Sequence, residues 1–364
     1  MKKMLLMLGL FVGIVGNAQR FDWVKFTSSV SIGGNSAGAF GIAKDDKNFI
    51  YTISGFVDNL DVGNDTIVHV GTFYGQNLAI IKWNSDGEIV NTKQLSAGHF
   101  GLTPFQITYD DDNEQILITA AVSQMPVEIV DDTTYTEESS PVQLIRFNKD
   151  LEYVSHVNLL NTYHSSMVSK DGATYIANNY QSVVRKIGAN NITEWTVTAT
   201  QGAFSITDII IGANDTVYAI GCMAVSGSDT AITFGGVTLN VPLGAVNQIG
   251  IFKMTTSGTV LQGFRLGQTT SVYANMRLSA DAEGNVYAAV PYSIGGQTIG
   301  DHTLSTTVGA NDAFVVKLSS DLVPQWVTEL HNSTANMETN DLLTHLDVFA
   351  VGGLLGYWVA TDYA

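Results

Sequence analysis

One short stretch of this sequence has the spacing of a catalytic motif. Residues 34–38 read GNSAG, which matches the G-x-S-x-G pattern that presents a nucleophilic serine, here Ser36. That chemistry needs a strand, a sharp turn and then a helix, so that the hydroxyl stands exposed above a sheet. The residues that follow, AFGIAKD, have instead the pattern of a strand ending in a turn. We therefore interpret GNSAG as a connection and expect no nucleophile at Ser36.

Metal ligands are a second kind of chemistry that the residue types allow. The seven histidines show no H-x-H, H-x-x-x-H or H-E-x-x-H spacing, so no local zinc site is predicted, and a site assembled from separate segments stays open. The calcium candidates are Asn84, Asp86 and Glu88 in the stretch NSDGE. They do not complete the oxygen set of a calcium loop, and the alternative is an ordinary turn. We expect no cofactor.

The elements that would position such residues recur along the chain. Five segments have the same form, an apolar run with a basic residue near its end, a short polar turn and a second apolar run. The basic residues of these five segments are Lys82, Arg146, Lys186, Lys253 and Lys317. Each segment reads as a β-hairpin, and a second hairpin precedes each one. The chain is therefore predicted to repeat a unit of four short strands, which we call a, b, c and d.

A four-stranded unit repeated without intervening helices predicts an all-β fold, a β-propeller of antiparallel blades around a central axis. The five complete blades are expected at about 38–96, 102–160, 165–199, 204–266 and 274–330, with a partial sixth at 342–364. Residues 21–26, FDWVKF, resemble a strand d without its own a, b and c. We expect this strand to close the ring by pairing into the last blade, because an open ring would expose sheet edges. Since strand c of the sixth blade is missing, we also expect the natural chain to continue beyond residue 364.

The final two complete units carry a family resemblance. Gly284-Asn285-Val286-Tyr287, Thr303-Leu304, Asp312–Leu318 and Trp326 match the G-N-x-Y, T-L, D-A-F-V-x-K-L and W elements of the SBBP-type bacterial β-propeller repeat. The earlier units match only in outline. The resemblance implies an exported propeller of the kind found in Bacteroidota-like surface or secreted proteins, often with a C-terminal sorting domain. The family attaches no catalytic residues to these repeats.

The N-terminus and the composition indicate a cellular address. Residues 1–18 combine two lysines, a short apolar run and small residues, the pattern of a secretory signal peptide, which leaves 19–364 as the propeller domain. We expect an exported protein, extracellular, at the outer-membrane surface or periplasmic, without a membrane span and monomeric. The net charge of −17 argues against nucleic acid as a partner. Cys222 is the one cysteine, so no internal disulfide can form.

The long insertions of this fold are expected on one face, where the b–c and d–a connections emerge. Blade three has almost no insertion there, which predicts a notch above it. We expect an unknown extracellular ligand, carbohydrate or protein, to use this notch through Tyr163, His164, Tyr180 and Phe204. The protein is then a binding or scaffold module without catalysis. The alternative is a polysaccharide hydrolase or lyase whose site lies in the axial cleft and needs titratable side chains from several blades.

Overall fold

The computed structural model describes residues 27–29, 38–62, 65–70, 75–97, 101–122, 126–136, 142–159, 164–178, 182–224, 231–241, 247–268, 276–292, 295–305, 312–330, 343–351 and 354–361. These residues form β-strands and one short 3₁₀ turn, η2 (Ala213–Asp215), so the prediction of an all-β fold is confirmed. Among the described residues, no helix is long and apolar enough to cross a membrane.

Five units share one strand order, in which each strand pairs antiparallel with the next, from an inner strand a to an outer strand d. Blade 1 is β2 (Gly38–Lys44), β3 (Ile50–Phe56), β6 (Asn77–Trp83) and β7 (Ile89–Ala97), and blade 2 is β8 (Leu102–Asp110), β9 (Gln115–Val122), β12 (Val142–Asn148) and β13 (Tyr153–Asn158). Blade 3 is β14 (His164–Lys170), β15 (Ala173–Asn178), β16 (Val183–Ile187) and β17 (Thr193–Gln201), and blade 4 is β18 (Ala203–Gly212), β19 (Thr216–Ala224), β22 (Gln248–Thr255) and β23 (Val260–Gln268). Blade 5 is β24 (Arg277–Ala280), β25 (Val286–Tyr292), β28 (Asp312–Leu318) and β29 (Pro324–Leu330), followed by the hairpin β30 (Leu343–Val351) and β31 (Leu354–Thr361).

The turn between strands c and d has the same geometry in all five blades. In blade 1 the amide of Asn84 donates to the carbonyl of Glu88, and the amide of Gly87 donates to the carbonyl of Asn84. The other four turns repeat both bonds at 148–152, 188–192, 255–259 and 319–323. The fourth residue of each turn has a positive φ, between 56° and 87°. This geometry suits Gly87 and Gly258, but Leu151 and Leu322 adopt it as well.

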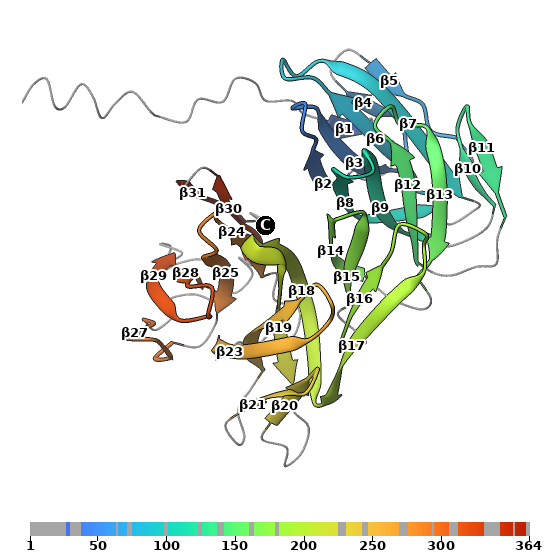
Figure 1. Ribbon diagram of the computed structural model, residues 1–364. Helices are drawn as coiled ribbons and strands as arrows, with labels where there is room; N and C mark the ends of the chain where they lie inside the picture. The colour runs from blue at the N-terminus through green and yellow to red at the C-terminus, as the bar shows by residue number, and fades with distance from the viewer. Residues whose placement is uncertain are drawn as a thin grey trace, which may run out of the picture.

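The inner strands hold the blades in sequence. β2 contacts β8, β8 contacts β14, β14 contacts β18, β18 contacts β24 and β24 contacts β30, so the blades follow one another along an arc (Figure 1). Four apolar clusters fill the spaces between consecutive blades, from the blade 1–2 cluster around Ile53 and Ile107 to the blade 4–5 cluster around Ile220 and Val316. These clusters form because each sheet carries apolar side chains on both faces and packs against a neighbouring blade.

In the described parts of the chain, four short hairpins are inserted between strands b and c, and two of them extend the sheet of the preceding blade. The four hairpins are β4 (Leu60–Val62) with β5 (Asp65–Ile67), β10 (Val127–Ile129) with β11 (Thr133–Tyr135), β20 (Ala231–Phe234) with β21 (Val237–Asn240), and β26 (Thr298–Ile299) with β27 (His302–Thr303). β10 pairs with β7 and β20 pairs with β17, in each case the outer strand of the blade before. In the same way β4 pairs with β1 (Thr27–Ser29). The predicted closing strand at 21–26 lies outside the described residues.

Two glycines with a similar positive φ allow the cost of backbone strain to be compared with the cost of a steric clash. Gly101 has φ +74°, and a Cβ there would clash with the backbone of Gln76. Gly101 and Gln76 form an isolated bridge just before β8 and β6. Gly236 has φ +87°, and a Cβ there would meet nothing within 4 Å. We expect Gly236→Ala to lower the free energy of unfolding by about 1 kcal/mol, and Gly101→Ala to lower it by about 2 to 3 kcal/mol. Urea denaturation of both variants checks this, and equal losses would show that crowding at Gly101 is relieved.

Candidate functional site

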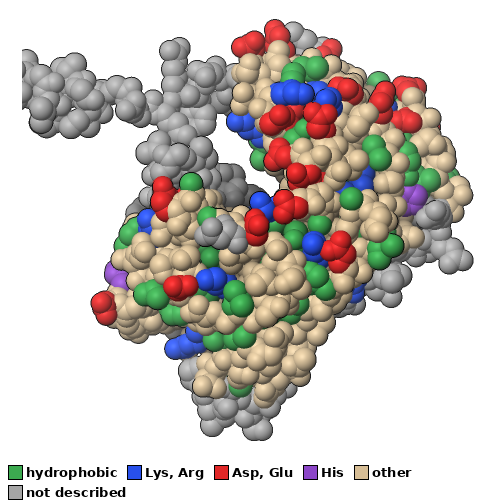
Figure 2. Space-filling model, in the orientation of Figure 1, with side chains coloured by type: hydrophobic (Ala, Val, Ile, Leu, Met, Phe, Trp, Pro, Cys, Tyr) green, Lys and Arg blue, Asp and Glu red, His purple; other side chains and the backbone are tan. Residues whose placement is uncertain are grey.

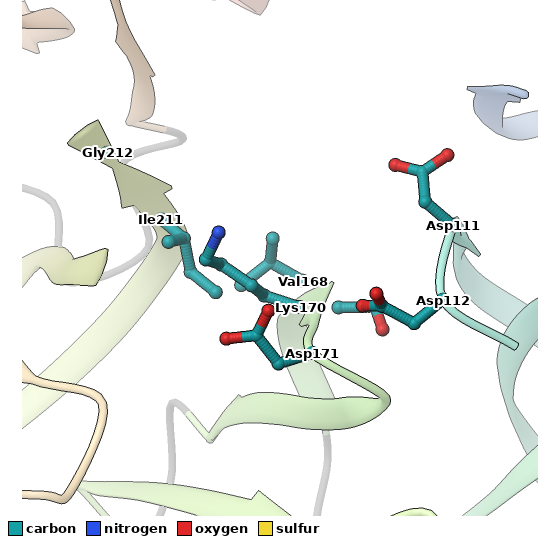
Figure 3. A pocket seen from close by; sticks show the side chains of 8 residues that line it. Asp111, Asp112, Val168, Lys170, Asp171, Ile211 and Gly212 are labelled. Carbon is teal, nitrogen blue, oxygen red and sulfur yellow. The ribbon is translucent and has the colours of Figure 1, made fainter. Parts of the chain in front are cut away.

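A pocket of about 350 Å³ opens where the a–b turns of three consecutive blades meet. Its walls come from the β8–β9 turn, from the end of β14 with its turn, and from the end of β18 (Figure 3). The lining residues are Asp111, Asp112, Val168, Ser169, Lys170, Asp171, Ile211 and Gly212. Val168 and Ile211 are partly buried and give the pocket an apolar side beside its charged rim.

The charges around this pocket are mostly negative. The cation Lys170 is already paired with Asp215, with 3.0 Å between Nζ and Oδ1, and Asp112 accepts a hydrogen bond from the amide of Gly172 at 3.1 Å. The pKa of Asp111 is raised, first by partial burial and then by the repulsion of Asp46 and neighbouring aspartates. A raised carboxylate pKa in a pocket marks a position where a positive group would be stabilised. Acidic side chains also gather over the first two blades on the face shown in Figure 2.

The pocket lies at the opposite end of the blades from the predicted ligand site. The a–b turns line it, whereas the predicted notch belongs to the end that carries the b–c and d–a connections. Tyr163 and Tyr180 lie outside the described residues, and only the backbone of His164, the first residue of β14, is described. The four predicted residues are therefore not shown to come together, and the notch stays a prediction.

Phe204, the fourth residue predicted to bind the ligand, is a core residue in this structure. Its side chain is fully buried, and its ring centroid lies 5.3 Å from that of Phe234 and 5.0 Å from that of Phe252. Its amide donates to the hydroxyl of Ser182 at 2.8 Å. A ligand could contact this ring only if the core between blades 3 and 4 opened.

The calcium candidates hold a turn together. Oδ1 of Asn84 accepts hydrogen bonds from the amides of Asp86 and Glu88 at 3.0 and 2.8 Å, and Nδ2 of Asn84 donates to the Glu88 carboxylate at 3.0 Å. Asn148, Asp150 and Glu152 repeat all three bonds in the next blade. A cation at this turn would need oxygen atoms directed at it. The Glu88 carboxylate instead accepts a hydrogen bond from the Asn84 amide. No group of three or more potential metal ligands occurs among the described residues, and Ser36 lies outside them.

A second set of polar residues lies at one level of the inner strands. We call it the collar, and its members are Gly41, Gln106, Ser166, Asp208, Arg277 and, by register, His345. In five of the six strands a one-residue register shift directly precedes the collar residue. Such bulges re-aim the side chain that follows them. The side chains of Gln106, Ser166 and Asp208 each form a hydrogen bond with the next inner strand.

Asp208, in the collar, connects three inner strands. Its Oδ1 accepts hydrogen bonds from the hydroxyl of Ser166 at 2.6 Å and from the amide of Ile209 at 3.0 Å, and its Oδ2 accepts one from the amide of Leu278 at 2.7 Å. These partners belong to the inner strands of blades 3, 4 and 5. Burial raises the pKa of Asp208, opposed by the charge of Arg277 and by these bonds. In the described collar, the one carboxylate thus joins three strands, and this role does not require catalysis.

Comparisons with known proteins give distant structural neighbours. No family model and no curated protein matches the chain. A protein of unknown function from Bacteroides caccae is 12% identical, covers 82% of each chain and has a TM-score of 0.40. A catalytically inactive virginiamycin B lyase from Staphylococcus aureus, solved with quinupristin, is 12% identical over 93% of this chain and 96% of its own, with a TM-score of 0.42. A member of the DUF4221 family from Bacteroides vulgatus is 9% identical over 93% and 91%, with a TM-score of 0.39.

The strand order and the chain of inner-strand contacts define the class of protein. Five four-stranded antiparallel sheets, each packed through its inner strand on the next, form an all-β repeat structure with a β-propeller-like fold. The SBBP-type assignment stays a prediction, since no family model matches.

Proposed function

We propose that this protein is an exported β-propeller that binds an extracellular ligand, carbohydrate or protein, and acts as a monomer without catalysis. Export is inferred from the signal-peptide pattern of residues 1–18. The pocket between the a–b turns of blades 2, 3 and 4 carries the binding proposal. It is concave, has an apolar side and a charged rim, and is formed by three repeats, as in many binding sites of repeat proteins.

The pocket favours a ligand that donates hydrogen bonds and carries positive charge. Carboxylates accept hydrogen bonds from hydroxyl and ammonium groups. Partial burial and then the repulsion of Asp46 raise the pKa of Asp111, and a nearby positive charge would oppose both effects. Val168 and Ile211 offer apolar contact for the carbon skeleton of a sugar ring or of a lysine stem. An amine-bearing sugar or a basic peptide segment meets all of these conditions.

Two sugar probes with the same backbone, one with amines and one with acetamides, test this ligand class, and a peptide is the third probe. Fully deacetylated chitosan tetramer carries amines, whereas chitotetraose carries neutral acetamides on the same sugar chain. We expect calorimetry to show binding of the amine form, at least about fivefold tighter than the acetylated form. Tetralysine peptide is the corresponding probe for a protein ligand. Failure of all three probes to bind at millimolar concentration would overturn the assignment of this pocket.

Asp111→Asn should separate binding from stability. The amide removes a charge from a repulsive cluster, so we expect a small gain in the free energy of unfolding at pH 7, about 0.3 kcal/mol, together with a loss of about fivefold or more in affinity for the amine probe. The folded-state pKa of Asp111 is raised, so the wild type is protonated and unstrained at low pH and loses stability as the pH rises through that pKa. The stability gain of the variant should therefore vanish at acidic pH.

The ionisation of Asp111 should also control binding. It lowers the stability of the protein but should raise its affinity for the amine probe. A cation prefers ionised Asp111, so affinity for the amine probe should increase as the pH rises through the pKa of Asp111. The control is Asp301→Asn, an exposed aspartate in the β26–β27 hairpin at the other end of the blades. Unchanged affinity in Asp111→Asn, or an equal loss in Asp301→Asn, would show that the probe binds by overall charge and not in this pocket.

A further inference from the structure

The inner strand of blade 1 exposes an apolar residue that its counterparts bury. The residue after the collar is Ile107 in blade 2, Met167 in blade 3, Ile209 in blade 4 and Leu278 in blade 5, and these side chains are 2% to 6% exposed. In blade 1 the same position is Ile42, which is 67% exposed, next to Phe40 at 39%. The inner strand of the preceding blade packs against this position in blades 2 to 5. In the part of the chain that the structure describes, no inner strand precedes β2 in this way.

At three steps a similar hydrogen bond joins neighbouring inner strands. The collar residue of one blade meets the backbone of the post-collar residue in the next. Nε2 of Gln106 donates to the carbonyl of Met167 at 3.1 Å, the amide of Ile209 donates to Ser166 Oγ at 3.1 Å, and the amide of Leu278 donates to Asp208 Oδ2 at 2.7 Å. In blade 1 the collar residue is a glycine and has no side chain to form this bond. It lies equally close to the next strand, because a Cβ on Gly41 would be 3.4 Å from the amide nitrogen of Ile107.

A second contact joins the outer parts of neighbouring blades. In three blades the aromatic residue of strand b donates its hydroxyl to the second carbonyl of the next c–d turn. The pairs are Tyr51 with Lys149 at 3.1 Å, Tyr175 with Thr256 at 3.5 Å, and Tyr218 with Ser320 at 3.2 Å. Lys82 and Trp195 reinforce two of these joints by donating to the same carbonyls.

The hairpin β30–β31 has the register of strands a and b in these blades. His345 pairs with Ala360 directly after a register shift, as Asp208 pairs with Ile220. Trp358 stands two residues before Ala360, as Tyr218 stands two residues before Ile220. β30 lies against β24 and β25, in the position that follows blade 5. The hairpin thus carries a collar position and an aromatic position for a joint with a following blade.

We propose that β30–β31 closes the arc onto blade 1. In the closed form, the His345 position lies beside the backbone of Ile42, so that β30 covers the Ile42 side chain. The Trp358 position then lies beside the blade 1 c–d turn, at the carbonyl of Ser85. The outer side of the joint is consistent with this arrangement. β1 pairs with β4 as β7 pairs with β10 and β17 with β20, which gives β1 the outer-strand position of the sheet that precedes blade 1.

Disulfide trapping in the full chain tests this proposal. The double variant His345→Cys with Ile42→Cys brings two thiols together only if β30 lies beside β2, since disulfides need Cα atoms within about 7 Å. Native Cys222 is buried, so it does not compete. We expect most chains to form an intramolecular disulfide on mild oxidation at micromolar concentration, seen by intact mass and by a peptide linking the two sites.

Two further pairs of cysteine substitutions serve as the positive and the negative control. Ser166→Cys with Ile209→Cys is the equivalent pair at the joint of blades 3 and 4 and should cross-link to a similar extent. Val68→Cys, at another exposed apolar residue of the first blade region, should not cross-link with His345→Cys. If the reference pair links and the His345–Ile42 pair does not, the proposal is wrong. If the His345–Ile42 link forms only between two chains, a second copy covers Ile42 and the proposal is equally wrong.

Discussion

Asp208→Ala is expected to lower the free energy of unfolding by about 3 to 5 kcal/mol. The substitution removes the acceptor for the Ser166 hydroxyl and for the amides of Ile209 and Leu278, and all of these groups are buried in the inner strands. It also removes the negative charge that faces Arg277. Because the partners come from blades 3, 4 and 5, the loss should appear as a lower urea midpoint for the whole transition.

Asp208→Asn separates hydrogen bonding from volume. The amide keeps the size of the side chain, but its NH₂ group must face an N–H or O–H donor, so we expect a loss of about 2 kcal/mol or more. The raised pKa of Asp208 means that the wild type loses stability as the pH rises through the folded-state pKa, so the penalty of the asparagine should be smaller at pH 8 than at pH 4. Asp215→Asn is the matched control, since its exposed pair with Lys170 contributes little. A loss below about 0.5 kcal/mol for Asp208→Ala would contradict the role of the collar.

Phe204→Ala is expected to destabilise the protein by about 3 to 5 kcal/mol. The truncation leaves a cavity among Phe234, Phe252 and the surrounding side chains between blades 3 and 4, which are close-packed and cannot fully relax. Phe204→Leu preserves most of the apolar volume and should lose less than about 1.5 kcal/mol. Thermal and urea unfolding of the two variants give the comparison.

A control distinguishes a core role from a binding role. Val154 is 44% exposed on β13, and Val154→Ala should change the stability by less than about 0.5 kcal/mol. If Phe204→Ala kept the wild-type stability but abolished binding of a ligand, Phe204 would be a ligand contact, as the sequence suggested. The packing of Phe204 between blades 3 and 4 would then be wrong.

The repeated local geometry could be predicted from the sequence because short-range chemistry determines it. Asp86-Gly87 and Ser257-Gly258 indicate hairpin turns, and both lie in c–d turns with Gly87 and Gly258 at positive φ. Leu151 and Leu322 occupy the same conformation without any such signal. In those blades the pattern of apolar runs on either side identified the hairpin, and the turn follows from the pairing of the strands.

The sites could not be predicted in the same way, because they depend on contacts between distant segments. The sequence does not show whether the ring of Phe204 is buried in a core or exposed to a ligand. The contacts with Phe234 and Phe252, which come from distant parts of the chain, show that it is buried. The collar depends on bulges whose position no residue type marks. Asp111 and Asp112 are neighbours in the sequence, but the pocket forms only where the β14 turn and the end of β18 approach them.

A crystal structure of the protein tests most directly whether successive sheets surround one axis and are joined through the collar of their inner strands. We predict that Asp208 accepts hydrogen bonds from Ser166 and from the amide of Leu278. We also predict that the six inner strands β2, β8, β14, β18, β24 and β30 follow in this order around the axis, with β30 beside β2 over Ile42. Inner strands in a different order, or an Asp208 side chain that faces solvent, would contradict these predictions.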